Sequence, residues 1–331
     1  MSNKTDEISA GEEERRKDGQ AHMRQAWFLY LNDIEPTRPR LFRYCRKLTG
    51  NVWDAEDLVQ DTLLRGFSNL ALEDNRDIAW GAYLARTASN LFIDQTRRQS
   101  HASLEEAEEP SEPSVAETAA AIRDGGRKLM TVLSPQERCA IVLKDVFEYT
   151  LTETASLLET TEGAVKAALH RGREKLADPT PSTRPAPSEA LVQRFVDAFN
   201  AADVNAMRDT MLQTVTAEVF ALGTGRGLDN IDKPDRWIGA CLNGHSPDPT
   251  RQQRAECAIF EGMPIVILWR RFGEGPENME EIWRFHPQDG KIAHIWDYCA
   301  CPETLEEVGQ ALGYPVVTRS YSTYQGELGE E

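Results

Sequence analysis

Residues 54–70 read DAEDLVQDTLLRGFSNL, and this stretch decides the fold of the N-terminal half. Asp54 is a typical N-cap residue, and the apolar side chains after it recur every three or four positions. They form one stripe on a helix: Ala55, Leu58, Val59, Leu63, Phe67 and Leu70. Asp57, Gln60 and Asp61 fall outside the stripe. The stretch therefore predicts an amphipathic helix that buries one side and exposes an acidic face.

Helical patterns continue on both sides of this stretch. Residues 39–49 predict a helix that ends at Gly50, and residues 71–77 predict a polar loop. The next predicted helix buries Trp80, Leu84, Ala88 and Leu91. Its exposed residues are Arg86, Asn90, Asp94, Arg97 and Arg98. Together these patterns predict an all-helical first domain.

A second helical block contains two capping boxes, which begin at Ser134 and Thr150. Each starts a helix, and residues 159–161 form a turn before a third helix from Glu162. Val165, Leu169 and Leu176 face inward on this third helix. Its outer face carries Lys166, His170 and Arg173, flanked by Arg171 and Lys175. The block therefore predicts a helix-turn-helix with a basic outer surface.

The last part of the chain follows a different pattern. Residues 191–199 predict one helix, and Met207 and Met211 mark a second. A loop is expected over residues 223–227. Strand-like runs follow at residues 255–260, 265–272, 279–286 and 291–298, and one more helix at 302–313. Helices followed by an antiparallel meander predict an α+β domain.

Two linkers divide the chain into domains. Residues 99–124 are acidic and contain two prolines, and residues 179–187 are rich in proline. The sequence thus predicts a disordered tail at residues 1–20, a helical domain at 21–98, a helix-turn-helix domain at 125–178 and a C-terminal domain at 188–331.

Bulk properties limit the class of protein. The chain has 331 residues and a formal net charge of −17, which argues against a nucleic acid partner unless basic residues cluster locally. No apolar run approaches the ~20 residues of a membrane span. The polar N-terminus is unlike a secretory signal, and six scattered cysteines fit a reducing compartment. We therefore expect a cytoplasmic protein.

The two helical blocks resemble domains of extracytoplasmic-function sigma factors of the sigma-70 family. LTGNVWDAEDLVQDT at residues 48–62 and YLARTASNLFIDQTRR at 83–98 resemble the second sigma domain. LSPQER at residues 133–138 and AVK at 164–166 lie where the fourth sigma domain has similar residues. A lone helix-turn-helix is weak evidence, but both matches occur in the expected order.

The resemblance implies a role for each exposed face. Asp57, Gln60 and Asp61 would dock on the coiled coil of the polymerase's largest subunit, although a solvated helix surface is the alternative. Residues 71–79 and Asn90 would open the −10 element and read an unstacked base. Phosphate contacts would come from Arg86, Arg97 and Arg98. Contacts to the −35 element in the major groove would come from Lys166, His170, Arg171 and Arg173.

This sequence departs from the family at two positions of the helix-turn-helix. Ala168 stands where an arginine is frequent, and Glu159 stands in the turn where glycine is common. These departures leave the promoter sequence open, whereas the docking mode is expected to be retained.

The C-terminal region resembles the SnoaL-like domains, cone-shaped α+β folds related to polyketide cyclases and ketosteroid isomerases. The residues that carry this resemblance are LVQRFVDAFNAAD at 191–203 and the strands that follow. Enzymes of this fold use an Asp or His as a base. The candidates here are Asp229, His245, His294 and Asp297, which lack a diagnostic spacing. We therefore expect a regulatory domain without catalytic activity or cofactor.

Cysteines in this region raise the question of a metal. Cys299 and Cys301 are separated by a single residue, and His294, Cys241 and Cys257 are further candidate ligands. Cys-x-Cys is not the usual zinc spacing, and single cysteines in strands are usually small core residues. No metal is therefore expected.

The sequence predicts a sigma factor that brings core RNA polymerase to the −10 and −35 elements of specific promoters. A small ligand or a separate anti-sigma protein is a further partner that fits the family. One alternative is a SnoaL-like enzyme or ligand sensor tethered to a helix-turn-helix. Another is a one-component repressor, which needs only one of the two helical blocks.

Overall fold

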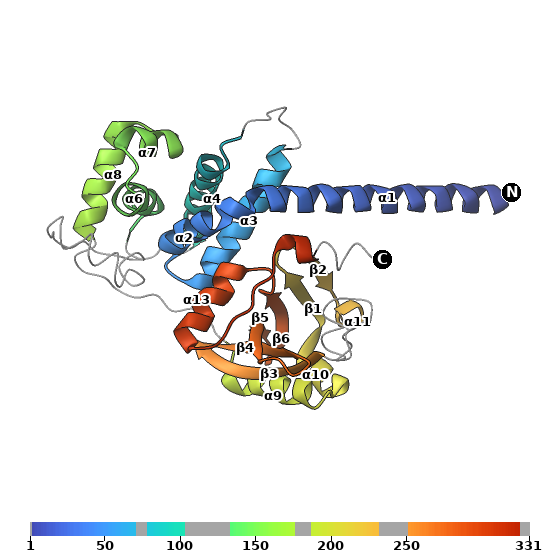
Figure 1. The fold of residues 1–331 in the computed structure, drawn as a ribbon. Helices are drawn as coiled ribbons and strands as arrows, with labels where there is room; N and C mark the ends of the chain where they lie inside the picture. Colours follow the sequence, from blue (N-terminus) through green and yellow to red (C-terminus); the bar gives the residue numbers. More distant parts are fainter. Residues whose placement is uncertain (1, 71–77, 103–132, 176–186, 232–250, 325–331) are drawn as a thin grey trace.

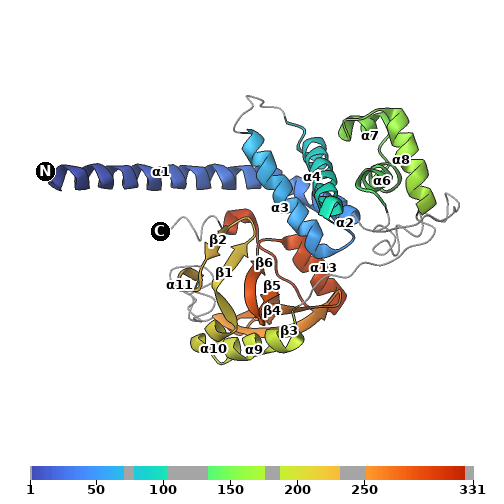
Figure 2. The ribbon, with the colours of Figure 1, turned by 180° about the vertical axis from the view of Figure 1, so that it is seen from behind.

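The computed structural model describes residues 2–70, 78–102, 133–175, 187–231 and 251–324. Figure 1 shows three parts: a helical domain (residues 2–102), a helix-turn-helix domain (133–175) and a C-terminal domain (187–324). The last two lie on different sides of the helical domain, as the view from behind in Figure 2 confirms. No helix within these ranges is long and apolar enough to cross a membrane.

The helical domain contains α1 (Ser2–Ile34), the 3-10 turn η1 (Glu35–Thr37), α2 (Arg38–Thr49), α3 (Val52–Leu70) and α4 (Trp80–Ala102). α2 ends at Gly50, which adopts a left-handed φ of 81°, as predicted. α3 begins before Asp54, the predicted N-cap, because Asn51 takes that role. Its Oδ1 accepts the backbone N–H of Asp54 at 2.8 Å. The predicted loop at residues 71–77 lies outside the described ranges.

A disordered tail was expected at residues 1–20, whereas α1 begins at Ser2 in the described chain. Residues 2–34 are rich in Glu, Arg, Lys, Gln and Ala, which favour helix, and contain no proline. The C-terminal turns of α1 are held by ring contacts. The ring centres of Trp27 and Phe67 are 5.1 Å apart, and those of Tyr30 and Trp80 are 5.4 Å apart. The rest of the helix extends away from the body in Figure 1.

The helix-turn-helix domain contains α6 (Pro135–Ile141), the π-helical turn η3 (Val142–Val146), α7 (Leu151–Leu157) and α8 (Glu162–Lys175). Both predicted capping boxes are confirmed, with Ser134 and Thr150 as N-caps. Glu159, in the turn before α8, has a φ of 51°. A left-handed residue is required there, which explains why glycine suits this position. Leu176 lies outside the described residues.

The C-terminal domain is α+β, as predicted. Its elements are α9 (Glu189–Asn200), α10 (Val204–Asp209), β1 (Met211–Val219), β2 (Gly223–Arg226), α11 (Leu228–Ile231), β3 (Arg251–Phe260), β4 (Met263–Phe272), β5 (Asn278–Gln288), β6 (Lys291–Asp297) and α13 (Pro302–Leu312). The strand order is β2-β1-β6-β5-β4-β3. Phe195 and Phe199 of α9 pack on Trp283 of the sheet.

Two expectations for this domain are corrected. Met211 begins a strand rather than belonging to the second helix, and residues 223–226 form a strand rather than a loop. β1 runs parallel to β6 and antiparallel to β2, so the sheet is not a pure meander. The reason is nonlocal pairing, which the local sequence pattern does not encode.

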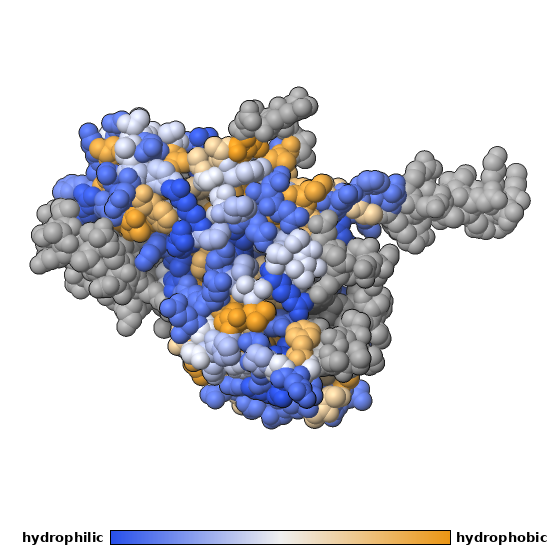
Figure 3. Space-filling view, in the orientation of Figure 1, coloured by the Kyte–Doolittle hydropathy of each residue, from blue (hydrophilic) through white to orange (hydrophobic). Residues whose placement is uncertain are grey.

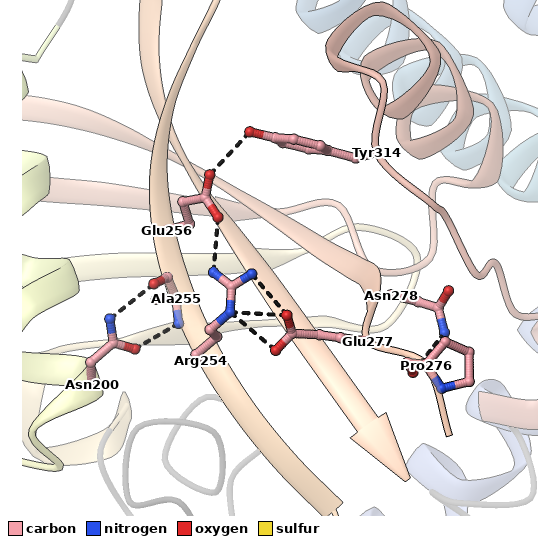
Figure 4. Close-up of polar contacts among 8 residues, drawn as sticks. All are labelled: Asn200, Arg254, Ala255, Glu256, Pro276, Glu277, Asn278 and Tyr314. Carbon is pink, nitrogen blue, oxygen red and sulfur yellow. Dashed lines mark hydrogen bonds and ion pairs between the residues drawn. The ribbon is translucent and has the colours of Figure 1, made fainter. Parts of the chain in front are cut away.

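Polar contacts fasten the edges of the sheet (Figure 4). Asn200 of α9 exchanges two hydrogen bonds with the backbone of Ala255, at 2.7 and 2.9 Å. Arg254 pairs with Glu277 and Glu256, and the hydroxyl of Tyr314 donates to Glu256 at 3.0 Å. The chain after α13 is thereby tied to β3, and it also pairs with β5 through backbone bonds at Met279.

On the face that Figure 3 shows, hydrophilic side chains predominate and the apolar patches are small and separate. Large apolar side chains that remain exposed include Leu29 and Leu64 of the helical domain and Phe272 of β4. Isolated exposed apolar residues are normal in soluble domains, so only those that line a groove point to a binding surface.

Most of both predicted linkers lies outside the described ranges, which leave out residues 103–132 and 176–186. Residues 99–102 continue α4, so the helical domain extends beyond its predicted end at residue 98.

Candidate functional site

The three residues predicted on the acidic face of α3 have different environments. Asp61 is exposed and accepts a hydrogen bond from Gln95 at 2.7 Å. Asp57 is half-exposed, and its carboxylate lies 3.5 Å from the guanidinium of Arg284 in the C-terminal domain. Gln60 is only 5% exposed and donates to Glu56 at 2.7 Å. The expected open face is therefore corrected: the C-terminal domain covers part of it.

The covering surface consists of aromatic rings and one cation. The ring centre of Trp53 on α3 lies 5.1 Å from that of Tyr298 and 5.8 Å from that of Phe260. The guanidinium of Arg284 lies 4.3 Å from the ring centre of Trp296 and also faces Trp53. Desolvation by this packing raises the pKa of Asp57 to about 7, and the charge of Arg284 opposes the shift. The interface thus combines apolar contact with charge complementarity.

A buried polar cluster fixes α13 to the helical domain. Glu56 is fully buried and accepts hydrogen bonds from Arg38 at 2.5 Å and from Thr304 at 2.8 Å. Arg38 is 1% exposed and also pairs with Glu303. Nearby, Arg46 pairs with Glu307 and Glu261. Because buried charges need partners, Glu303 and Thr304 of the C-terminal helix serve as further partners of this ion pair.

A groove of about 350 Å³ remains open between α3 and α4. Its lining residues are Asp61, Leu64, Arg65, Ser68, Leu91, Asp94 and Gln95. Leu64 is 53% exposed and lines this groove, so it offers an apolar contact to a binding partner. The sequence carries one signal for this groove, because Leu64 is a large apolar residue that lies outside the apolar stripe of α3.

The candidate DNA contacts of the helical domain lie along α4. Asn90 and Arg86 are exposed on its surface. The guanidinium of Arg86 lies 3.5 Å from the carboxylate of Glu159 in the helix-turn-helix domain. Arg97 and Arg98 belong to the last turns of α4. The part of this site over residues 71–77 is outside the described ranges.

The basic face predicted on α8 is partly engaged within its own domain. Lys166 and His170 are exposed, as predicted. Arg171 is 53% exposed, with Nε 3.1 Å from the carboxylate of Glu137. Arg173 donates two hydrogen bonds to Asp145 of η3, at 2.7 and 3.1 Å. Arg173 is therefore less open than its position on the helix predicts.

Three of the four acid–base candidates of the C-terminal domain lie in the described ranges, and they have different partners. Asp229 is exposed and pairs with Arg208 at 2.9 Å. His294 stacks on Trp296 with ring centres 4.3 Å apart, and its Nε2 lies 3.5 Å from the carboxylate of Glu218. Asp297 is fully buried, and His245 lies outside the described residues. They do not form a catalytic constellation within the described chain.

The cysteine candidates in the described ranges differ in burial. Cys299 and Cys301 are buried, Cys257 is half-buried, and Cys241 lies outside the described residues. Among the residues that the structure describes, no three His, Cys, Asp or Glu side chains are arranged to hold a metal ion.

Asp297 belongs to a buried group of charges in the sheet. Glu281 pairs with Arg270 and accepts a hydrogen bond from Trp283 at 3.3 Å. Asp297 accepts the backbone N–H of Cys299 at 2.8 Å. Burial first, and then the neighbouring charge of Glu281, raise the pKa of Asp297 well above its ordinary value. The folded protein therefore favours the neutral acid at this position.

The change Asp297→Asn is expected to flatten the pH dependence of stability. The pKa of the Asp297 carboxyl is higher in the folded protein than in the unfolded chain. Its contribution to the free energy of unfolding is therefore fully present below the unfolded-state pKa, and it is lost as the pH rises toward the folded-state pKa. One proton bound on folding gives a slope of about 1.4 kcal/mol per pH unit. The amide that replaces the carboxyl would keep the bond to Cys299 without ionising. Urea unfolding from pH 5 to pH 8 measures this. An identical pH slope in both proteins would contradict the assignment.

Comparisons with known proteins agree with this arrangement. Residues 34–102 match the family model described as "Sigma-70 region 2". Residues 127–176 match the model described as "Sigma-70, region 4". The ECF RNA polymerase sigma factor SigG of Mycobacterium tuberculosis is 30% identical to this chain in sequence. The aligned part covers 63% of this chain and 62% of the length of SigG. The RNA polymerase sigma-E factor of Streptomyces coelicolor is 30% identical over 50% of this chain and 87% of its own length.

A likeness to solved structures is also found. The crystal structure of the M. tuberculosis sigma factor SigJ aligns with 80% of this chain and 95% of the SigJ chain. The sequence identity is 21% and the TM-score is 0.32. The sequence matches decide the family, because two sigma-70 regions occur in the expected order and the sigma-E factor is matched over most of its length. The chain belongs to the extracytoplasmic-function sigma factors of the sigma-70 family.

Proposed function

We propose that this protein binds core RNA polymerase and directs it to specific promoters for DNA-templated transcription initiation. The observation that carries the proposal is the joint presence of an acidic groove on α3 and α4 and a helix-turn-helix with exposed basic residues on α8. An acidic groove suits a basic partner surface, and a basic helix suits DNA. A repressor or a tethered enzyme has no use for the acidic groove.

The polymerase-binding surface is proposed to centre on Asp61 and Leu64. Both line the groove that the C-terminal domain leaves open. Asp57 would join this surface only after its ion pair with Arg284 is broken. Gln60 is proposed to support the surface from inside, since it orients the buried carboxylate of Glu56.

The DNA-binding surfaces are proposed to be α4 and α8. Asn90 would read an unstacked base of the −10 element, with Arg86, Arg97 and Arg98 on phosphates. Lys166, His170 and Arg171 would contact the −35 element. Arg173 is assigned to holding α8 in place, because its guanidinium is engaged by Asp145.

The C-terminal domain is proposed to regulate the sigma core rather than to catalyse a reaction. Support comes from its sheet face, which is engaged in docking on α3 through Arg284 and Tyr298. Further support comes from its acid–base candidates, which lie apart from one another within the described chain. A domain that covers part of the polymerase-binding helix can lower the affinity for polymerase by competition.

Charge reversal at Asp61 tests the proposed function. Asp61→Lys is expected to weaken binding to core RNA polymerase at least tenfold, or about 1.4 kcal/mol, because it places a cation against a basic partner. Titration of the labelled full chain with core enzyme measures the Kd. The control is Asp33→Lys, an exposed position on α1. Transcription of fragmented genomic DNA with each holoenzyme, followed by 5′-end sequencing, reads promoter selection. Failure of the unmodified chain to bind core enzyme would refute the proposal.

A further inference from the structure

A pocket of about 220 Å³ lies where the helical domain meets α13 and the chain that follows it. Both ribbon views place α13 beside this domain (Figures 1 and 2). The polar residues that line the pocket are Glu35, Arg38, Glu303, Glu306, Arg319 and Tyr321. None of them lines the groove between α3 and α4. The volume is several times the ~30 Å³ of one water molecule and below the roughly 300–1,000 Å³ of pockets for drug-sized ligands, so it suits a small molecule.

The two cations of this pocket are held by carboxylates that lie outside it. Arg38 is 1% exposed, and its Nη2 lies 2.5 Å from the carboxylate of Glu56. The guanidinium of Arg319 lies 2.8 Å from the carboxylate of Glu280. Neither of these two glutamates lines the pocket. The charges of the carboxylates inside the pocket are therefore not balanced by its own cations.

Three carboxylates give the pocket an excess of negative charge. Glu303 shares the guanidinium of Arg38 with Glu56, and one cation balances only one of these two acids. Glu35 and Glu306 form no ion pair within the described chain. A cationic ligand group is therefore favoured. The rings of Pro39 and Pro302 also line the pocket and offer an apolar wall for the methylene groups of an organic cation.

The buried end of the pocket offers hydrogen-bond donors. Tyr321 is 3% exposed, and burial raises the pKa of its hydroxyl, which therefore keeps its proton. The guanidinium of Arg38 lies near this hydroxyl, but a guanidinium only donates, so the hydroxyl proton has no acceptor within the described chain. Nε of Arg38 also lacks an acceptor there. Buried donors without acceptors are unfavourable, and an oxygen of a ligand would satisfy them.

The N-terminus of α13 favours the same ligand group. Pro302 and Glu303 begin this helix and line the pocket, and its N-cap residue Cys301 forms no side-chain capping bond. The free N–H groups at a helix N-terminus attract anions. Together with the hydroxyl of Tyr321 and Nε of Arg38, this helix end suits a carboxylate. The pocket thus combines carboxylate-binding donors with an excess of acids that suits ammonium groups.

We propose that this pocket binds a basic α-amino acid. Its carboxylate would accept hydrogen bonds from Tyr321 and Arg38 at the buried end. Its two cationic groups would pair with the three glutamates of the pocket, and its methylene groups would lie against the two prolines. A ligand of this class satisfies the buried donors and the excess negative charge at the same time.

The site is complete only when the C-terminal domain is docked on the helical domain. Glu35 and Arg38 come from the helical domain, whereas Glu306 and Tyr321 come from the C-terminal domain. A ligand that binds only the docked form shifts the population toward that form. The ligand is therefore expected to weaken binding to core RNA polymerase. This consequence rests on the proposed function, in which the docked domain covers part of α3.

Calorimetric titration of the full chain with L-lysine tests the site without polymerase. The expected Kd is about 1 mM or tighter. Cadaverine is lysine without the carboxylate, and L-norleucine is lysine with a methyl group in place of the side-chain ammonium. Each is expected to bind at least about fivefold more weakly than lysine. The absence of lysine binding up to about 20 mM, or equal binding of either comparator, would overturn the proposal.

Two variants test the residues assigned to each end of the ligand. Tyr321→Phe removes the buried hydroxyl, and Glu306→Gln removes one carboxylate at an exposed position. Each is expected to weaken lysine binding at least about fivefold. Glu274→Gln, an equal change at an exposed position outside the pocket, should bind lysine like the unmodified chain. Circular dichroism verifies that each variant is folded. Unchanged lysine binding in both folded pocket variants would refute the site.

A polymerase titration separates this inference from the proposed function. Lysine at about ten times its Kd is expected to raise the Kd for core enzyme at least about threefold in the unmodified chain. The Kd should not change on adding lysine to Tyr321→Phe. If lysine binds but leaves the Kd for core enzyme unchanged, the coupling to docking is refuted. Failure of the lysine-free chain to bind core enzyme would instead refute the proposed function and leave the calorimetric test of the pocket intact.

Discussion

The change Arg284→Glu is expected to release the C-terminal domain from α3 and to tighten binding to core RNA polymerase at least tenfold. Arg284 is 6% exposed and is surrounded by Trp53, Trp296 and Asp57. A carboxylate at this position would lose the cation–π contacts and would repel Asp57. An unpaired charge buried at an interface is strongly unfavourable. The form with the C-terminal domain docked on α3 would therefore no longer be more stable than the undocked form.

Titration of labelled full-length chain with core enzyme measures this effect. Hydrogen exchange of α3 should rise in the same variant, since the helix loses its cover. The control is Lys291→Glu, a charge reversal of equal size at an exposed position of β6. A Kd that is unchanged or weaker in Arg284→Glu would show that the domain does not compete with polymerase at α3.

The change Arg38→Met is expected to destabilise the protein by about 3–5 kcal/mol, the usual loss when one partner of a buried ion pair is removed. Glu56 would stay fully buried with Gln60 and Thr304 as its remaining hydrogen-bond donors in the described chain. Urea unfolding at neutral pH measures the free energy of unfolding.

Arg43→Met is the matched control for this change, because Arg43 is an exposed arginine of the same helix. It should alter stability by less than about 0.5 kcal/mol. The double change Arg38→Met with Glu56→Leu should recover part of the lost stability, since the fully buried carboxylate at position 56 is removed together with its cation. Equal unfolding free energies for the two single variants would contradict the buried-pair assignment.

Local sequence patterns predict the features whose cause is local. Both capping boxes form as expected, because Ser134 and Thr150 each meet a glutamate three residues later. α13 begins at Pro302 and is capped by Gly313, which has a φ of 72°. The four strands from residue 251 onward also follow their predicted runs.

Features that depend on distant partners are not visible in the sequence patterns. The strand that begins at Met211 pairs with β6, which lies far later in the chain. The residues next to Met211 in sequence resemble the end of a helix, because the pairing partner is not among them. Gln60 has the spacing of an exposed residue, yet it is 5% exposed and donates to the buried carboxylate of Glu56. The contact between Asp57 and Arg284 spans 227 residues. Arg173 likewise has the spacing of an open position, but its partner Asp145 belongs to another element.

The position of α13 in the chain sets the order of events during synthesis. Thr304 and Glu56, which form a buried hydrogen bond, are 248 residues apart. At about 5–20 residues per second, a ribosome needs roughly 12–50 s to make the intervening chain. During that interval the newly made helical domain carries Arg38 and Glu56 without their cover. The contact with α13 therefore forms late, and each new molecule passes through a period in which its α3 face is open.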